Sequence, residues 1–258
     1  QREAKMHMAY AYLRRELQEI HLKGKIVNLT ELIEATLKKY QIAVLDLMNY
    51  KSLYQILYIA NEYAAINQNY GLIERYVRKS YQYIQGLEKP KERHLYYHLY
   101  ILYYLANFNL RNKRFSESIS YLRQMRMLME NSKSYKEQFI LRYQLLLGLN
   151  YHFSGKAEEG IEAIEEGLSY VTKKSNQEDI DDLYLSLTMF YAQHGDSRSL
   201  SHLAKLGHTD HWYEKKMGML WTIRKNLMEF LVHLQFENTE LAVSRLHSFK
   251  RRYKKYLL

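Results

Sequence analysis

Cysteine is absent from the 258 residues, and proline occurs only once. Without cysteine there are no disulfides, no thiolate nucleophile and no zinc–thiolate or iron–sulfur site. Ten glycines and one proline also supply few turn residues for a β-rich fold, whereas 47% hydrophobic residues can fill a large helical core. The composition therefore predicts an all-α protein. The absence of cysteine fits a reducing compartment, so we expect a cytoplasmic location.

The sequence also lacks an uninterrupted apolar run long enough to span a membrane, which needs about 18 to 20 residues. The richest segment, residues 96–110, is interrupted by His98, Asn107 and Asn109. Residues 1–22 have the pattern of a charged amphipathic helix and not that of a signal peptide. We therefore expect no membrane partner. Because the chain begins with Gln instead of Met, we also expect it to be part of a longer protein.

Motifs that would indicate catalysis are missing. The sequence contains no G-x-S-x-G nucleophile elbow, no G-x-G-x-x-G or G-K-[ST] phosphate loop, and no serine with an evident His and acid partner. We therefore expect no catalytic residue, no cofactor and no enzymatic activity.

Metal-ligand chemistry is concentrated in residues 207–212, where His208, Asp210 and His211 follow His202 at short distance. The same segment is equally typical of a helix start, with Thr209 or Asp210 as the N-cap. We favour this structural interpretation, and we predict no metal site.

A recurring pattern of small residues indicates helical hairpins. Ala106 precedes a short polar break and Ser118 follows it, and Gly148 and Gly160 have the same places around the next break. Both anchors repeat after 42 residues (106 to 148 and 118 to 160). Two independent anchors with one spacing predict a repeated structural unit.

Weaker copies of the pattern extend the repeat over most of the chain. They lie at residues 60–77, 187–196 and 231–246, and the last has Leu231 and Leu234 at the apolar positions of its first helix. The expected helices are residues 2–22, 29–48, 51–68, 70–86, 91–112, 115–131, 134–154, 157–174, 178–194, 197–206, 209–236 and 239–257.

With small residues at the eighth and twentieth repeat positions and an aromatic near the seventeenth, the chain resembles the tetratricopeptide repeat family. The units here are near 40 residues, so the helices are longer than usual in that family. The resemblance implies a right-handed superhelix, an α-solenoid of about five to six antiparallel helical hairpins. It further implies one domain over residues 1–258, because each hairpin covers the apolar face of its neighbour.

The concave side of such a solenoid is its usual binding surface. The resemblance assigns first-helix positions on that side to Tyr58, Tyr100, Tyr103, Asn107, Arg111, Arg142, His152 and Arg224, together with Glu62 and Gln193. Tyrosine, arginine and asparagine in this mixture are typical of a peptide groove. The alternative interpretation is that the tyrosines are hairpin core with their hydroxyls at the solvent edge.

The leading functional hypothesis is a non-catalytic module that binds a protein or peptide, as a scaffold or as the sensing domain of a bacterial-type regulator. The alternative is nucleic-acid binding through a basic surface, because the net charge is +10. The dense basic cluster at residues 250–255 is more typical of a solvated helix C-terminus. The apolar end, residues 256–258, leaves homodimerisation as an open question.

Overall fold

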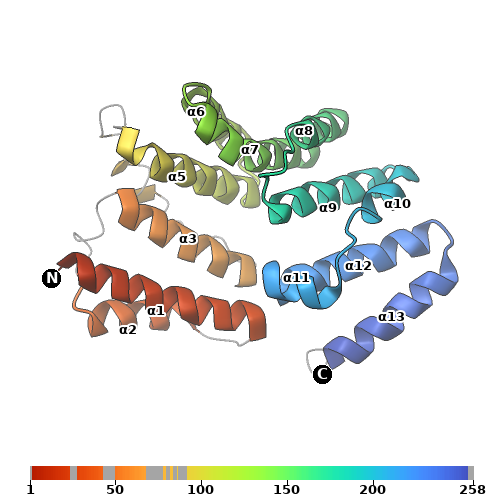
Figure 1. Ribbon diagram of the computed structural model, residues 1–258, viewed down its shortest axis with the longest axis horizontal. Coiled ribbons are helices and arrows are strands. Elements are labelled where there is room, and N and C mark those ends of the chain that lie inside the picture. Colours follow the sequence, from red (N-terminus) through yellow and green to blue (C-terminus); the bar gives the residue numbers. More distant parts are fainter. Residues whose placement is uncertain are drawn as a thin grey trace. The chain divides into compact units, whose positions relative to one another are not determined.

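The computed structural model describes residues 2–23, 28–42, 50–67, 78–79, 82–83, 86 and 92–254. Within these residues the chain forms helices and connecting turns and no strand (Figure 1). The predicted all-α class is therefore confirmed. The helices pack into two compact units, Gln1–Leu146 and Leu147–Leu258.

The first unit contains five complete helices and the start of a sixth among its described residues: α1 (Arg2–Lys23), α2 (Leu29–Lys39), α3 (Tyr50–Asn67), α5 (Glu92–Arg111), α6 (Phe115–Glu130) and the first part of α7 (Lys133–Phe153). Helix α1 packs against α2 and α3, α3 packs against α5, and α5 packs against α6, as Figure 1 also shows. Each helix therefore lies beside neighbours that are close in sequence, as expected for helical hairpins.

The second unit continues from the end of α7 with α8 (Ala157–Ser169), α9 (Gln177–Gln193), α10 (Arg198–Leu203), α11 (Asp210–Lys216), α12 (Met219–Gln235) and α13 (Thr239–Tyr253). Antiparallel neighbours again pair along the chain: α8 with α9, α9 with α10, and α12 with α13. Helix α12 also contacts α9, α10 and α11, so it forms the centre of this unit.

Both repeat anchors lie where two consecutive helices approach each other closely. In the first, Ser118 Oγ of α6 donates a hydrogen bond to the carbonyl oxygen of Ala106 in α5 at 2.8 Å. In the second, a Cβ atom added to Gly148 would lie 2.9 Å from the carbonyl oxygen of Gly160 and 2.6 Å from the Ile164 side chain. A larger residue at Gly148 would therefore force α7 and α8 apart.

Several predicted helix boundaries are wrong for local reasons. The helix expected at 29–48 ends at Lys39, and Gln41 then has a φ of 53°. The helix expected at 209–236 is divided into α11 and α12 by Gly218, which has a φ of 87° that glycine adopts readily. The helix expected at 157–174 ends at Ser169. Most of the helix expected at 70–86 lies outside the described residues.

None of the helices in the described part of the chain is long and apolar enough to cross a membrane.

Candidate functional site

One side of α5 carries a row of aromatic and polar side chains. Tyr96, Tyr100, Tyr103, Asn107 and Arg111 follow one another at intervals of four, three, four and four residues, which places them on a single helix face. Helix α3 adds Tyr54 and Tyr58 beside this row. We use the name tyrosine face for the six partly buried tyrosines of these two helices, which are Tyr54, Tyr58, Tyr96, Tyr97, Tyr100 and Tyr103.

The rings of the tyrosine face contact one another and a buried ring beneath them. The ring centre of Tyr100 lies 5.0 Å from that of Tyr54, 4.9 Å from that of Tyr96 and 4.8 Å from that of Phe139 in α7. These distances and the tilted or edge-on geometries are those of favourable aromatic pairs. Phe139 is fully buried and Tyr104 is 6% exposed, so the partly exposed rings are supported from below by core residues.

A positive charge borders the tyrosine face. Arg142 of α7 donates a hydrogen bond from Nη1 to the Tyr100 hydroxyl at 2.7 Å, and its guanidinium carbon lies 5.4 Å from the centre of the same ring. Burial raises the pKa of Tyr54 to about 12, although Arg14 and Arg142 act in the opposite direction. Burial and the neighbouring Tyr100 also raise the pKa of Tyr96. These phenols are therefore neutral at physiological pH and can donate hydrogen bonds.

Two asparagines join α3 to α5 at the end of the row. Asn107 donates from Nδ2 to Oδ1 of Asn61 at 3.1 Å, and Arg111 Nε donates to Oδ1 of Asn107 at 3.3 Å. Asn61 is buried and donates to the carbonyl oxygen of Leu57 at 2.9 Å. Asn107 thus helps to fix the position of α5 against α3. Glu62 belongs to α3, but its side chain lies outside the described part of the structure.

The structure brings six of the eight predicted partner-binding residues into the first unit and two into the second. Of these two, His152 of α7 stacks on Phe190 with ring centres 3.8 Å apart, and its Nε2 forms a hydrogen bond with Oε1 of Gln193 in α9. Burial lowers the pKa of His152, so the ring is neutral and acts as a contact between helices. Arg224 is an exposed residue of α12.

Helix α12 has an unusual distribution of side chains. Leu227, Leu231 and Leu234 are 44%, 55% and 52% exposed and follow at intervals of four and three residues, so they form one row, the leucine row. The opposite side of the helix buries Lys225 and Glu229. The apolar positions that the repeat pattern assigned to Leu231 and Leu234 are therefore not buried, which corrects that prediction.

Charged side chains occupy the buried side of α12. Lys225 Nζ lies 3.2 Å from Oδ1 of Asp210 in α11 and 3.1 Å from Oε2 of Glu229. Arg245 of α13 reaches Oε1 of Glu229 at 2.9 Å. These ion pairs satisfy the buried groups and connect α11, α12 and α13, so α12 can bury its charged side.

The candidate metal segment is a helix start. Thr209 Oγ1 accepts a hydrogen bond from the backbone N–H of Trp212 at 3.3 Å, so Thr209 is the N-cap of α11. The ring of His208 stacks on Trp212 with centres 3.9 Å apart. Throughout the described ranges, no group of three or more His, Cys, Asp or Glu side chains could hold a metal ion.

Sequence reasoning missed Tyr54, Tyr96, Tyr97 and Phe139, which belong to the aromatic cluster. The signal for two of them was present, because Tyr54 precedes Tyr58 and Tyr96 precedes Tyr100 by four residues, one helical turn. Phe139 precedes Arg142 by three residues and shares its helix face. The family's repeat positions did not include these residues, and helical spacing alone would have added them.

The chain matches no protein-family model, no curated protein and no solved structure. Its class is therefore defined by its own geometry: an all-α protein of helical hairpins that carries a partly exposed tyrosine face.

Proposed function

We propose that the chain is a non-catalytic module that binds a peptide or protein segment on the tyrosine face. The observation that carries the proposal is the set of six partly buried tyrosines beside Arg142. Tyrosine gives a large contact area at low cost in conformational entropy, and its hydroxyl can bond the backbone of an extended segment. Arg142 adds a cation that can bind a carboxylate or a backbone carbonyl.

The proposal includes the arrangement that the repeat pattern predicts. The hairpins stack as an α-solenoid, and the tyrosine face belongs to its concave side. A binding module of this kind serves as a scaffold or as the sensing domain of a bacterial-type regulator in the cytoplasm. No catalytic step and no cofactor is part of the proposal.

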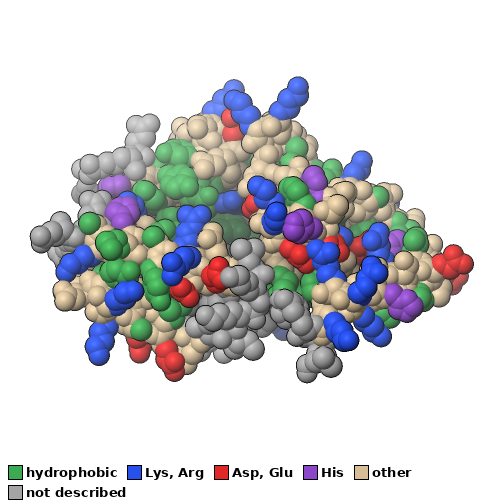
Figure 2. Space-filling model, turned by 60° about the horizontal axis from the view of Figure 1, so that its bottom comes forward, with side chains coloured by type: hydrophobic (Ala, Val, Ile, Leu, Met, Phe, Trp, Pro, Cys, Tyr) green, Lys and Arg blue, Asp and Glu red, His purple; other side chains and the backbone are tan. Residues whose placement is uncertain are grey.

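A protein partner is favoured over nucleic acid by the distribution of charge. Figure 2 shows Lys and Arg side chains interspersed with acidic ones on the part of the surface that is coloured by side-chain type. Several arginines are also engaged in ion pairs, such as Arg198 with Asp196 at 2.7 Å and Arg252 with Glu214 at 2.8 Å. A nucleic-acid site would instead present clustered cations with interleaved aromatics.

Selection from a displayed peptide library tests the proposal. The immobilised chain is expected to enrich related peptides, and a fluorescent copy of one of them should bind Arg142→Gln and Tyr100→Phe at least about tenfold more weakly than wild type. Tyr170→Phe is the matched control, because it removes a hydroxyl that bonds Glu166 at 2.9 Å outside the tyrosine face. The proposal fails if no peptide is enriched, or if all three variants bind equally.

A parallel titration with single-stranded RNA and DNA tests the alternative, nucleic-acid binding through the basic surface. Binding that falls steeply with salt and is unchanged in Tyr100→Phe would support the basic-surface hypothesis instead.

A further inference from the structure

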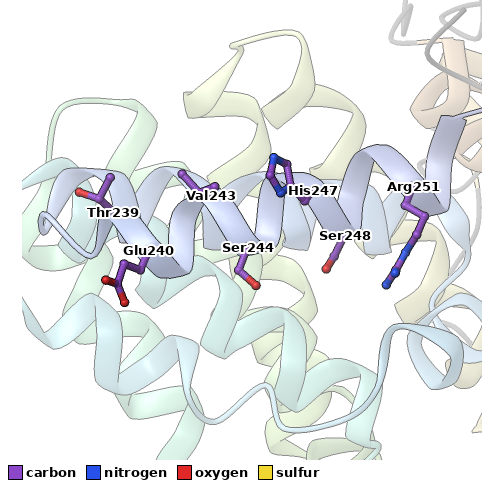
Figure 3. A pocket seen from close by; sticks show the side chains of 7 residues that line it. All are labelled: Thr239, Glu240, Val243, Ser244, His247, Ser248 and Arg251. Carbon is purple, nitrogen blue, oxygen red and sulfur yellow. The ribbon is translucent and has the colours of Figure 1, made fainter.

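The outward side of α13 carries a shallow depression lined by residues of this helix alone (Figure 3). Two rows of side chains border it. One row is Thr239, Val243 and His247, and the other is Glu240, Ser244, Ser248 and Arg251. Every one of these side chains is exposed, and the helix packs into its unit through Ala242 and Tyr253 on the opposite side.

The charges of this surface are placed at its two ends. Glu240 is in the first turn of α13 and Arg251 is in the last turn, eleven residues later, which corresponds to about 16 Å along the helix axis. Neither side chain forms an ion pair within the described part of the chain. The neighbouring Arg245 and Arg252 differ, because they reach Glu229 and Glu214 at 2.9 Å and 2.8 Å. Arg245 and Arg252 are thus paired, whereas Glu240 and Arg251 are not.

We propose that this side of α13 binds the same side of a second copy of the chain, with the two helices antiparallel about a two-fold axis. The axis passes between residues 245 and 246. Glu240 then faces the partner's Arg251, and Arg251 faces the partner's Glu240. In a two-fold interface each contact occurs twice, so a surface with opposite charges at its two ends complements itself.

The side chains between the charges lie within one residue, about 1.5 Å, of the same register. Ser244 lies opposite the partner's Ser248, and these small residues let the two helices approach closely. In the other row Val243, which is 46% exposed, lies opposite the partner's His247 and is covered by it.

The expected dimer is weak. A single helix face buries less than the roughly 800 Å² per partner of a standard interface, and exposed ion pairs fix register more than they add affinity. We therefore expect a reversible equilibrium in the micromolar to millimolar range that weakens with salt. The inference does not depend on the tyrosine face or on the proposed function.

Sedimentation equilibrium of the whole chain at low salt tests the pairing through charge reversal. Glu240→Arg and Arg251→Glu should each raise the dimer dissociation constant about tenfold or more, because each places like charges opposite one another twice. The double variant should restore the wild-type constant within about threefold. A mixture of the two single variants should form the heterodimer, since every facing pair is then opposite in charge.

The leucine row provides the control surface. Leu227→Ser combined with Leu231→Ser should leave the dissociation constant unchanged, because these residues lie on α12 and outside the proposed contact. The proposal is overturned if wild type stays monomeric at millimolar concentration, if the charge reversals have no effect, or if the leucine-row variant abolishes the dimer. Circular dichroism of each variant checks that the helices are intact.

Discussion

The tyrosine face and the α12–α13 hairpin differ in the side chains that they bury between helices. Around α5, partly buried tyrosine rings pack against a buried apolar cluster. Around α12, Lys225 and Glu229 are buried and the leucine row is exposed. Both stretches contain regularly spaced apolar residues. Contacts with the neighbouring helices decide which side of each helix is buried. Hydrophobic spacing alone therefore does not identify the core side.

The largest expected effect comes from the buried charges. Lys225→Ala should lower the free energy of unfolding by about 3 kcal/mol, because it removes the buried cation between Asp210 and Glu229, while Arg245 still pairs with Glu229. Urea denaturation at neutral pH measures the change. Glu130→Ala is the control, since its ion pair with Arg126 is exposed and contributes about 0.5 kcal/mol or less. Equal effects of the two variants would mean that Lys225 is solvated.

The tyrosine face should respond to loss of the ring more than to loss of the hydroxyl. Tyr100→Ala removes contacts with Tyr54, Tyr96 and Phe139 and should cost about 2 to 3 kcal/mol of unfolding free energy, below the value for a fully buried ring. Tyr100→Phe keeps the ring, removes the hydroxyl that accepts the hydrogen bond from Arg142, and should cost about 0.5 to 1.5 kcal/mol. Similar costs for both variants in thermal unfolding would contradict the aromatic packing described above.

The second unit should also show a pH dependence that originates at Asp182. Burial raises the pKa of this carboxyl to about 7, and Asp179, Asp181 and Glu178 add to the effect, whereas the hydrogen bond from Trp221 Nε1 at 2.7 Å opposes it. A carboxyl with a raised folded-state pKa stabilises the fold below its unfolded pKa near 4 and loses that contribution as pH rises to 7.

Asp182→Asn keeps an acceptor for Trp221 and removes this titration. Its unfolding free energy relative to wild type should therefore rise by about 2 to 3 kcal/mol between pH 4.5 and pH 7.5. Denaturation curves at both pH values, followed by tryptophan fluorescence and circular dichroism, give the difference. Glu158→Gln, on the exposed side of α8, should show no such change. A constant difference at the two pH values would contradict the burial of the Asp182 carboxyl.

The smallest expected effect is that of a substitution in the exposed leucine row. Leu231→Ser should change the free energy of unfolding by no more than about 0.5 kcal/mol, because the side chain is 55% exposed. Leu187→Ser, at a fully buried position of α9, should cost several kcal/mol. Thermal unfolding of both variants under the same conditions compares their free energies of unfolding directly. A large loss for Leu231→Ser would show that the leucine row is covered by other parts of the chain.

Much of the fold could be predicted because helix periodicity and hairpin anchors are local properties. The 42-residue anchors at Ser118 and Gly160 both occur at close helix contacts. The break at Gly218 was not predictable in the same way, since an isolated glycine is also tolerated within a helix. For the candidate site, the resemblance to the tetratricopeptide repeat family pointed to the residues from Tyr100 to Arg111. The burial of Lys225 did not, because it depends on Asp210 and Glu229 meeting it in three dimensions.

The affinity of one library-selected peptide for two variants tests the central claim most directly. One variant carries Tyr100→Phe with Arg142→Gln, and the other carries Leu227→Ser with Leu231→Ser. Fluorescence polarisation should give a dissociation constant at least about tenfold higher for the tyrosine-face variant and within about twofold of wild type for the leucine-row variant. The opposite order, with binding lost only in the leucine-row variant, would contradict the assignment of the binding site to the tyrosine face.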